Sequence, residues 1–256
     1  MVKQPLQAFA FALSFLTRIP VPGEIDYNEE LPLRSTVFFP LVGLILGILL
    51  VVLDRLFRFL LPLPVAAILL LISYVYLTGA LHLDGLLDTM DGFFSGKSGQ
   101  EMEEIMRDSV NGSFASITAV LYLLLKFTFF WQLEPGLRLP GLLFFPVLSR
   151  FFMNVVMYRS PIAEGSSLGK IFGSDYPRVY LLLAAVVPVL LAGIISLAAL
   201  LPRYVLLAQF LAGLLTLYLI SKVIIRRLKG LTGDVYGMIN EVTEAVILLI
   251  LLIYQG

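Results

Sequence analysis

The feature that most constrains this chain is a series of long apolar runs. A helix needs about 20 mostly apolar residues to cross a hydrocarbon core about 30 Å thick, and several runs reach that length. Hydrophobic residues make up 59% of the chain and charged residues only 14%, whereas a soluble domain is about one quarter charged. The sequence therefore predicts an all-α, polytopic transmembrane bundle, formed as a single domain over residues 1–256.

About seven spans are predicted, at residues 36–53, 63–83, 113–131, 139–158, 179–201, 203–222 and 240–254. The segment 6–17 is a further membrane element. An uncleaved interfacial or re-entrant helix is favoured there over a signal peptide, because no small-residue cleavage site follows it.

Prolines and glycines refine this prediction. Proline is tolerated at a helix start, where its missing N–H costs little, and Pro140 and Pro202 fall at predicted span starts. Pro188 lies inside a span and predicts a kink. Gly43 and Gly47 are spaced to let two helices approach closely, although a chance pair of glycines is an equal alternative.

The basic residues predict the orientation. With the N-terminus inside, twelve Lys and Arg residues fall on inside segments, two lie within spans, and only four fall outside, namely Arg55, Arg58, Arg138 and Arg203. Basic residues favour the cytoplasmic side, so we expect a membrane protein with a cytoplasmic N-terminus. Only Asp54 and Glu134 among the acids fall outside. Acids do not set orientation, so their clustering predicts a polar site on the cytoplasmic face.

Composition excludes several classes of site. The chain has no cysteine and one histidine, which excludes disulfides, thiolate chemistry and a histidine-rich zinc site. Its net charge is zero and it has no basic patch, so nucleic-acid binding is not expected. Any metal must be held by oxygen ligands, which favours a hard cation such as Mg²⁺ or Mn²⁺.

The richest polar segment is the run from Leu81 to Gly92. On a helix, Asp84, Asp88 and Asp91 at i, i+4 and i+7 share one face. Their mutual repulsion near a membrane favours a bound divalent cation that also contacts substrate phosphates. The alternative is a solvated acidic helix end. His82 lies about 160° from this face on a continuous helix, and it is either a buried histidine with one hydrogen-bond partner or a proton-transfer group.

A second inside segment follows the aspartates. Arg107 suits bidentate contact with phosphate, or is a surface residue. Asn111-Gly112 is a turn signal, and Ser113 is expected to cap the next span. The glutamates on this segment are expected to form a solvated helix face without chemistry: Glu101, Glu103 and Glu104.

The last inside segment combines glycines with acids. The basic run before it is explained by the orientation rule. The glycines between Gly230 and Gly237 predict a tight loop that approaches a ligand. Beyond Asp234, three polar residues enter an apolar helix, namely Asn240, Glu241 and Glu244. Acids inside a span are candidates for function, as a second metal position or as the base that activates a hydroxyl.

Two cations lie within predicted spans. Arg150 is deep enough that we expect it to face the bundle interior and pair with an acid or a phosphate. Lys126 either does the same or extends its ammonium to the membrane surface.

These motifs together resemble the cobalamin synthase (adenosylcobinamide-GDP ribazoletransferase) family. The likeness is carried by Leu81–Gly92, Phe15–Pro22, Phe38–Gly43, Met106–Asp108 with Gly112, Ser149-Arg150, Pro161–Gly169, and Leu231–Gly237 with Glu241 and Glu244. The chain departs from the family pattern at Ala115 and at Lys229, where glycine is expected, and both departures concern loop geometry.

The resemblance implies a reaction and its partners. A hydroxyl of α-ribazole, or of α-ribazole 5′-phosphate, attacks adenosylcobinamide-GDP in a Mg²⁺-dependent phosphoryl transfer that releases GMP. The resemblance also implies the plasma (inner) membrane of a prokaryote, and it is compatible with a homo-oligomer and with a complex of late cobalamin-biosynthesis enzymes. The implied residues are the metal ligands Asp84, Asp88 and Asp91, the substrate-binding Arg107, Asp108, Arg150 and Asn240, and the catalytic Asp234, Glu241, Glu244 and His82.

Three other classes share some of these features. CDP-alcohol phosphotransferases follow Asp-Gly with Ala-Arg, where this chain has Leu86 and Leu87. Membrane prenyltransferases carry two aspartate-rich motifs, and this chain has one. A transporter favours acids near the midplane and repeated halves, whereas these acids gather at one face and no repeat is evident.

Overall fold

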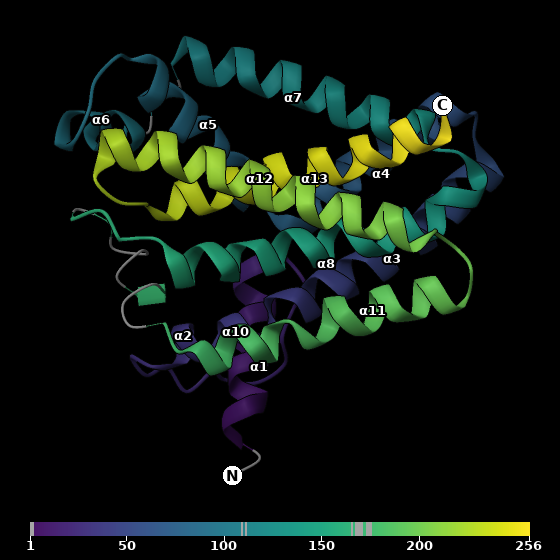
Figure 1. Cartoon of the computed structure of the whole chain (residues 1–256), viewed down its shortest axis with the longest axis horizontal. Helices are drawn as coiled ribbons and strands as arrows, with labels where there is room; N and C mark the ends of the chain where they lie inside the picture. The colour runs from purple at the N-terminus through teal and green to yellow at the C-terminus, as the bar shows by residue number, and fades with distance from the viewer. Residues whose placement is uncertain (1–2, 109, 111, 165, 167–170, 173–175) are drawn as a thin grey trace.

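The computed structural model describes residues 3–108, 110, 112–164, 166, 171–172 and 176–256. Figure 1 shows that most of the long helices run side by side along one axis. The helices are α1 Lys3–Leu16, α2 Leu31–Ser35, the 3₁₀ turn η1 Thr36–Phe38, α3 Phe39–Leu60, α4 Leu63–Thr78, α5 Leu81–Phe94, α6 Gln100–Met106, α7 Ser113–Gln132, α8 Pro135–Arg159, α10 Arg178–Ala184, α11 Val186–Leu197, α12 Arg203–Leu228 and α13 Gly233–Gln255.

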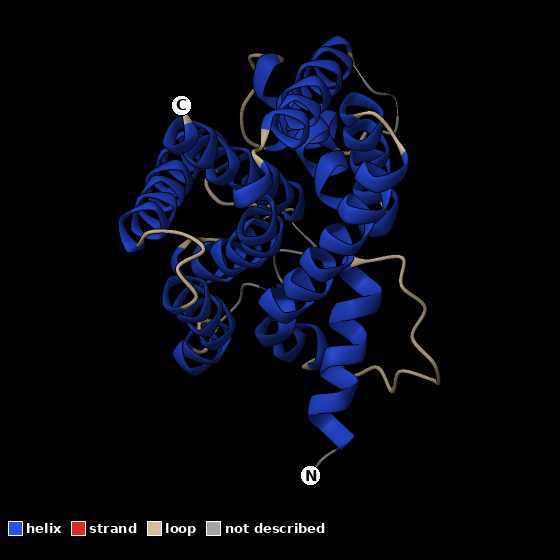
Figure 2. Ribbon diagram, turned by 90° about the vertical axis from the view of Figure 1, so that its right-hand side faces the viewer, coloured by secondary structure: helices blue, strands red, loops and turns tan. Residues whose placement is uncertain are grey.

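The spanning helices confirm the predicted class. Within the described residues, six helical segments are long and apolar enough to cross a membrane, or seven if the bent pair α4–α5 is one span. Helix α1 has 14 residues, too few to span, and it runs across the direction of the long helices in both views (Figures 1 and 2). The chain is therefore a polytopic α-helical bundle with a short additional helix near its N-terminus.

Helices α8 and α13 form the centre of the bundle. They are the most buried of the spanning helices, and they pack against each other, with α3 also on α8 and α5 and α12 on α13. The polar residues Ser149, Arg150 and Asn154 of α8 are fully buried. Because protein rather than lipid surrounds α8, these side chains can find polar partners.

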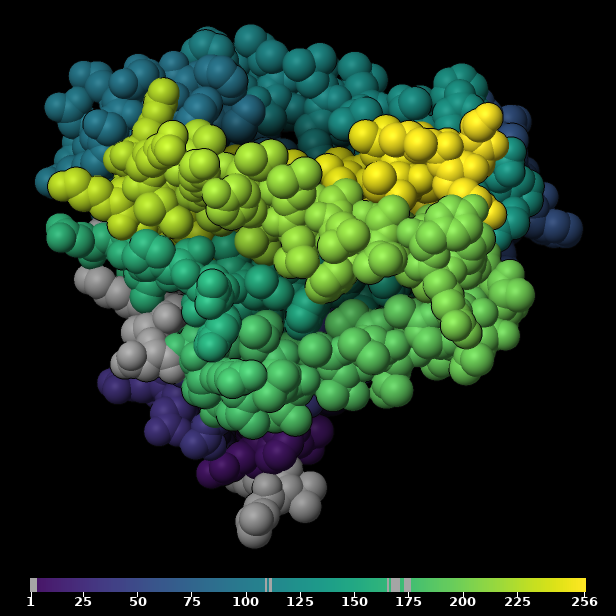
Figure 3. Space-filling view, viewed as in Figure 1, coloured from purple at the N-terminus to yellow at the C-terminus, as the bar shows by residue number. Residues whose placement is uncertain are grey.

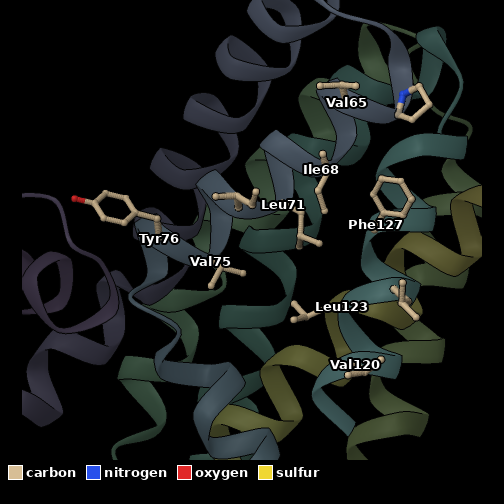
Figure 4. A pocket seen from close by; sticks show the side chains of 11 residues that line it. Val65, Ile68, Leu71, Val75, Tyr76, Val120, Leu123 and Phe127 are labelled. Carbon is tan, nitrogen blue, oxygen red and sulfur yellow. The ribbon is translucent and has the colours of Figure 1, made fainter. Parts of the chain in front are cut away.

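The outer helices present apolar side chains. Figure 3 shows α11 and α12 forming much of one face, and α12 exposes Leu207, Leu211 and Leu215 there. An apolar groove, with a volume of about 920 Å³, lies between α4 and α7 and is lined by residues such as Ile68, Leu123 and Phe127 (Figure 4). It contains no acidic residue, which separates it from the polar end of the bundle.

Close contact between α3 and α8 explains the first pair of glycines. A Cβ added to Gly47 would lie 2.9 Å from the carbonyl oxygen of Leu142, and one added to Gly43 would lie closer still to that of Pro146. The neighbouring atoms belong to backbone, which cannot give way as a flexible side chain does. The spacing Gly43-x-x-x-Gly47 is therefore a helix-packing motif.

Gly43→Ala should lower the free energy of unfolding by about 1–3 kcal/mol, the usual cost of overpacking a tight contact. The midpoint of thermal unfolding in detergent measures this loss. Gly193→Ala on α11 is the matched control, because a Cβ there meets nothing within 4 Å and alanine is the better helix former. Equal losses in the two variants would contradict the packing role.

The predicted continuous span 63–83 is wrong. Helix α4 ends at Thr78, and α5 continues at an angle of 88° to it. Gly79 and Ala80 both adopt left-handed backbone conformations, with φ of 61° and 58°, and their N–H groups bond to the carbonyls of Tyr76 and Val75. This is a Schellman-type helix end, so α5 starts as a new helix at the end of the bundle where α4 stops.

Other boundaries also differ from the prediction. Pro140 lies inside α8, whose first residue is Pro135. Pro188 has no N–H for the carbonyl of Ala184, and the helix is interrupted at Ala185, between α10 and α11. The expected glycine-rich loop is wrong as well: α13 begins at Gly233, so most of that stretch is helical.

Candidate active site

Helices α5 and α13 cross with their backbones almost in contact. A Cβ added to Gly85 would lie 2.6 Å from the carbonyl oxygen of Asp234, and one added to Gly237 would lie 3.1 Å from that of His82. Gly85 and Gly237 therefore serve helix packing, whereas the sequence predicted that Gly237 belongs to a ligand loop. Their effect is to bring the aspartate-rich motif and the Thr-Gly-Asp element, about 150 residues apart in the sequence, to one place.

Four carboxylates gather where α5 and α13 cross. Asp84 is exposed, whereas Asp88, Asp91 and Asp234 are partly buried. The negative charges of Asp84, Asp234 and Asp91, in that order of strength, act on the carboxylate of Asp88. Like charges that act on one another are unfavourable, so this group of carboxylates favours a positive partner.

Asp91 also has a structural contact. Its two carboxylate oxygens accept hydrogen bonds from the backbone N–H groups of Gly112 and Ala115, at 2.6 and 2.8 Å. It thereby caps the start of α7, a role that the sequence analysis gave wrongly to Ser113, which makes no side-chain cap. Ala115, one of the two departures from the family pattern, takes part through its backbone alone. Asn111 lies outside the described residues.

A cavity of about 250 Å³ opens beside Asp234. Arg107, Glu103 and Thr232 contribute to its wall. Thr232 caps α13 by accepting a hydrogen bond from the N–H of Val235, at 3.4 Å. Arg107 is exposed and donates to Glu103 at 3.0 Å. The expectation that Glu103 is solvated is wrong, because this side chain is buried and lines the cavity. The guanidinium of Arg107 therefore places a positive charge in the wall of this cavity, next to Asp234.

Asp108 makes a local contact. Its carboxylate accepts a hydrogen bond from the N–H of Val110 at 3.0 Å, and its side chain is exposed. Its predicted contact with substrate stays a prediction. Of the Pro161–Gly169 region, residues 165 and 167–169 lie outside the described part of the chain, as does Lys170.

A second group of charges lies deeper, between α7, α8 and α13. Lys126 is 2% exposed, and its ammonium donates to Glu241 at 2.7 Å and to Glu244 at 2.6 Å. The alternative that Lys126 extends to the membrane surface is therefore wrong. Arg150 donates to the other oxygen of Glu244. Two cations and two carboxylates form a neutral set, which is how charges are tolerated at this depth.

Polar side chains complete this buried cluster. The Tyr74 hydroxyl donates to Glu244 at 2.5 Å and that of Tyr122 to Glu241 at 2.6 Å, while Asn240 donates to Glu244 at 3.1 Å. The sequence analysis missed both tyrosines. In the sequence, each tyrosine is a polar hydroxyl within an apolar helix. This feature alone does not predict a buried contact, because tyrosine is also common at membrane interfaces.

The deep acids thus have partners already. The predicted roles of Glu241 and Glu244 in catalysis, and of Asn240 and Arg150 in substrate binding, stay predictions. The contacts themselves hold three helices in register. They place Arg150 beside His82, whose Nδ1 lies 3.5 Å from the guanidinium Nη2. His82 is 3% exposed, so it belongs to the interior at the first turn of α5.

The aspartates at the crossing of α5 and α13 suit a hard cation. Asp84 and Asp88 stand one helical turn apart with oxygen donors, and Asp234 lies opposite them on α13. Among the described residues, no three such side chains form a ready metal cage. Mg²⁺ does not require one, since it is commonly held by one or two carboxylates together with substrate phosphates. The residues therefore fit Mg²⁺ bound jointly with a diphosphate.

Comparison with known proteins identifies the family. The family model described as cobalamin-5-phosphate synthase matches residues 8–252. The chain belongs to this cobalamin-5-phosphate synthase family. Its members include proteins named adenosylcobinamide-GDP ribazoletransferase: one from Fusobacterium nucleatum is 36% identical over 97% of this chain and 98% of its own length, and one from Desulfitobacterium hafniense is 37% identical over 93% of each. No solved structure matches the chain.

Membership in the cobalamin-5-phosphate synthase family confirms the resemblance drawn from the motifs. The chain is accordingly a transferase of cobalamin synthesis and a multi-pass membrane protein. The family also decides against the other classes that share spaced aspartates, since the match extends over the whole bundle and is not confined to the acidic motif.

Proposed function

We propose that this transferase joins adenosylcobinamide-GDP to α-ribazole, or to α-ribazole 5′-phosphate, with release of GMP. The observation that supports this best is that Asp84 and Asp88 of α5 lie close to Asp234 of α13, which lines a cavity together with Arg107. Carboxylates for a cation and an arginine for phosphate are the parts that phosphoryl transfer needs. Relatives over nearly the full length carry the corresponding name.

The proposed reaction exchanges one phosphorus–oxygen bond for another. A ribose hydroxyl of the acceptor attacks the phosphorus that carries the cobinamide. A new O–P bond forms, the bond from that phosphorus to the bridging oxygen breaks, and GMP departs with this oxygen. The proton of the hydroxyl passes to a carboxylate, for which Asp234 is the best placed candidate because it lines the cavity opposite α5.

The residues divide the work between charge and position. Asp84 and Asp88 would hold Mg²⁺, with Asp91 contributing from the C-terminal part of α5, where it caps the start of α7. When bound, Mg²⁺ would neutralise the phosphate oxygens as the new bond forms. Arg107 would pair with a phosphate, exchanging its contact with Glu103 for one with substrate. The bias of basic residues toward this end favours a site that faces the cytoplasm across a prokaryotic plasma membrane.

Purified protein in detergent tests the proposal. With adenosylcobinamide-GDP, α-ribazole and Mg²⁺, GMP should accumulate together with the cobalamin product, and no ion gradient should be needed. Omission of either the acceptor or the metal should abolish GMP release. Release without an acceptor would indicate a hydrolase, and full activity in excess chelator would contradict the role of Mg²⁺. Parallel assays with free and phosphorylated α-ribazole identify the preferred acceptor.

A further inference from the structure

A second cavity, of about 200 Å³, lies between α1, α5, α8 and α13, and Asp84 and Asp234 belong to its wall. The apolar part of this wall comes largely from Phe15, Met153, Met157 and Phe172. Aromatic rings and thioethers are suited to the faces of a flat, aromatic ligand. The apolar part of the wall therefore suits the uncharged, aromatic portion of a ligand.

Two buried polar atoms in this wall have no hydrogen-bond partner within the described part of the chain. Tyr236 is 2% and His82 is 3% exposed, and both line the cavity. Among the residues that the structure describes, neither the Tyr236 hydroxyl nor His82 Nε2 has a hydrogen-bond partner. Buried polar atoms without partners cost free energy, so two of them at one cavity indicate a ligand that supplies the missing bonds.

Arg150 determines which hydrogen His82 can offer. A guanidinium only donates hydrogen bonds, so the His82 Nδ1 that lies 3.5 Å from it must be the accepting nitrogen. The proton of the neutral imidazole is then on Nε2. His82 consequently presents an N–H donor, which requires an acceptor atom on the ligand.

The cavity adjoins the place where phosphoryl transfer is proposed. Gly233 and Asp234 belong to its wall and also to the wall of the cavity that holds Arg107. We call the cavity of about 200 Å³ the lower cavity and the one that is lined by Arg107 the upper cavity. A ligand bound in the lower cavity could therefore present a hydroxyl beside Asp234 while a phosphate occupies the upper cavity.

We propose that the lower cavity binds the aromatic base of the acceptor, with His82 Nε2–H donating to the bare ring nitrogen of a benzimidazole-type riboside. In such a riboside one ring nitrogen carries the sugar and the other is an acceptor only. The guanine of the donor is less suitable, because its edge carries more donors and acceptors than His82 Nε2 and the Tyr236 hydroxyl, the two buried wall atoms without a partner among the described residues, can satisfy. The inference deepens the proposed function and rests on it.

Tyr236→Phe tests the inference with little risk to folding, since its hydroxyl has no partner to lose among the described residues. We expect the KM for α-ribazole to rise about fivefold, as for the loss of the one hydrogen bond that the Tyr236 hydroxyl would form with this ligand. The KM for adenosylcobinamide-GDP and the thermal midpoint should stay unchanged. Tyr176→Phe is the matched control. It is also buried, but its hydroxyl lies 2.9 Å from that of Thr36, so its loss should lower the midpoint and leave the acceptor KM unchanged.

The base itself can be varied to test His82. Wild-type protein should prefer a benzimidazole riboside over the matching indole riboside, which lacks the bare nitrogen, by about tenfold in kcat/KM. His82→Phe should remove this preference. An unchanged acceptor KM in Tyr236→Phe, a raised donor KM instead, or equal use of the two ribosides by the wild type would overturn the inference. Absence of GMP release by the wild type with every acceptor would refute the proposed function instead.

Discussion

Asp84→Asn should lower kcat by about 100–1,000-fold, the usual cost of removing one group that stabilises charge in a transition state. The substitution keeps the shape of the side chain and removes the charge proposed to hold Mg²⁺. The Mg²⁺ concentration for half-maximal GMP release should rise as well. Because Asp84 is exposed and repels Asp88, the thermal midpoint should stay the same or increase, which separates lost chemistry from lost folding.

Glu101→Gln is the control for this loss. Glu101 is an acid on the same end of the bundle, but it is exposed and paired with Lys97 at 2.9 Å on the surface of α6. Its neutralisation should leave kcat within a factor of about two, as expected for a surface ion pair. If Asp84→Asn keeps full Mg²⁺-dependent turnover, the aspartates of α5 do not bind the metal.

Lys126→Met should have the largest effect on stability. It leaves two buried carboxylates, Glu241 and Glu244, with Arg150 as the one remaining buried cation of the cluster among the described residues. Breaking a buried ion pair from one side costs about 3–5 kcal/mol, because an uncompensated charge stays behind. We expect a low yield of folded protein and a strongly reduced thermal midpoint in detergent.

A second substitution distinguishes charge from shape. Lys126→Met combined with Glu241→Gln restores neutrality, since Arg150 still pairs with Glu244, and it should recover at least half of the lost stability. Lys222→Met, at an exposed lysine of α12, should change little. If the double variant is no more stable than Lys126→Met, packing around the methylene chain and not electrostatics holds these helices together.

The helical architecture was accessible from the sequence because lipid imposes a simple rule on length and polarity. The breaks within it were harder to predict. A helix can end within an apolar run without any change in hydrophobicity. The turn at Gly79 and Ala80 depends on their left-handed backbone conformation, which hydrophobicity does not predict. The start of α13 was missed for the opposite reason, since glycine alone is a poor helix former and Gly237 becomes favourable only where α5 packs against it.

The candidate site was predictable in its residue types and less so in its pairings. Three aspartates on one face predicted a metal site, which stays a prediction, and the structure brings Asp234 of α13 to the same face. Which cation neutralises which acid depends on contacts between distant helices, as for Lys126 with Glu241. Glu103 was expected to be solvated because its neighbours Glu101 and Glu104 are polar, yet a short helix can turn one acid inward toward Arg107.

The turn between α4 and α5 also fixes how deep the aspartates lie. The sixteen residues of α4 rise only about 24 Å, less than a hydrocarbon core of about 30 Å. The chain therefore changes direction within less than the thickness of that core, and we expect α5 to carry its carboxylates near the level of the lipid headgroups. In the proposed reaction, a bulky amphiphilic substrate would then react while it rests at the membrane surface, without having to detach from the bilayer or cross it.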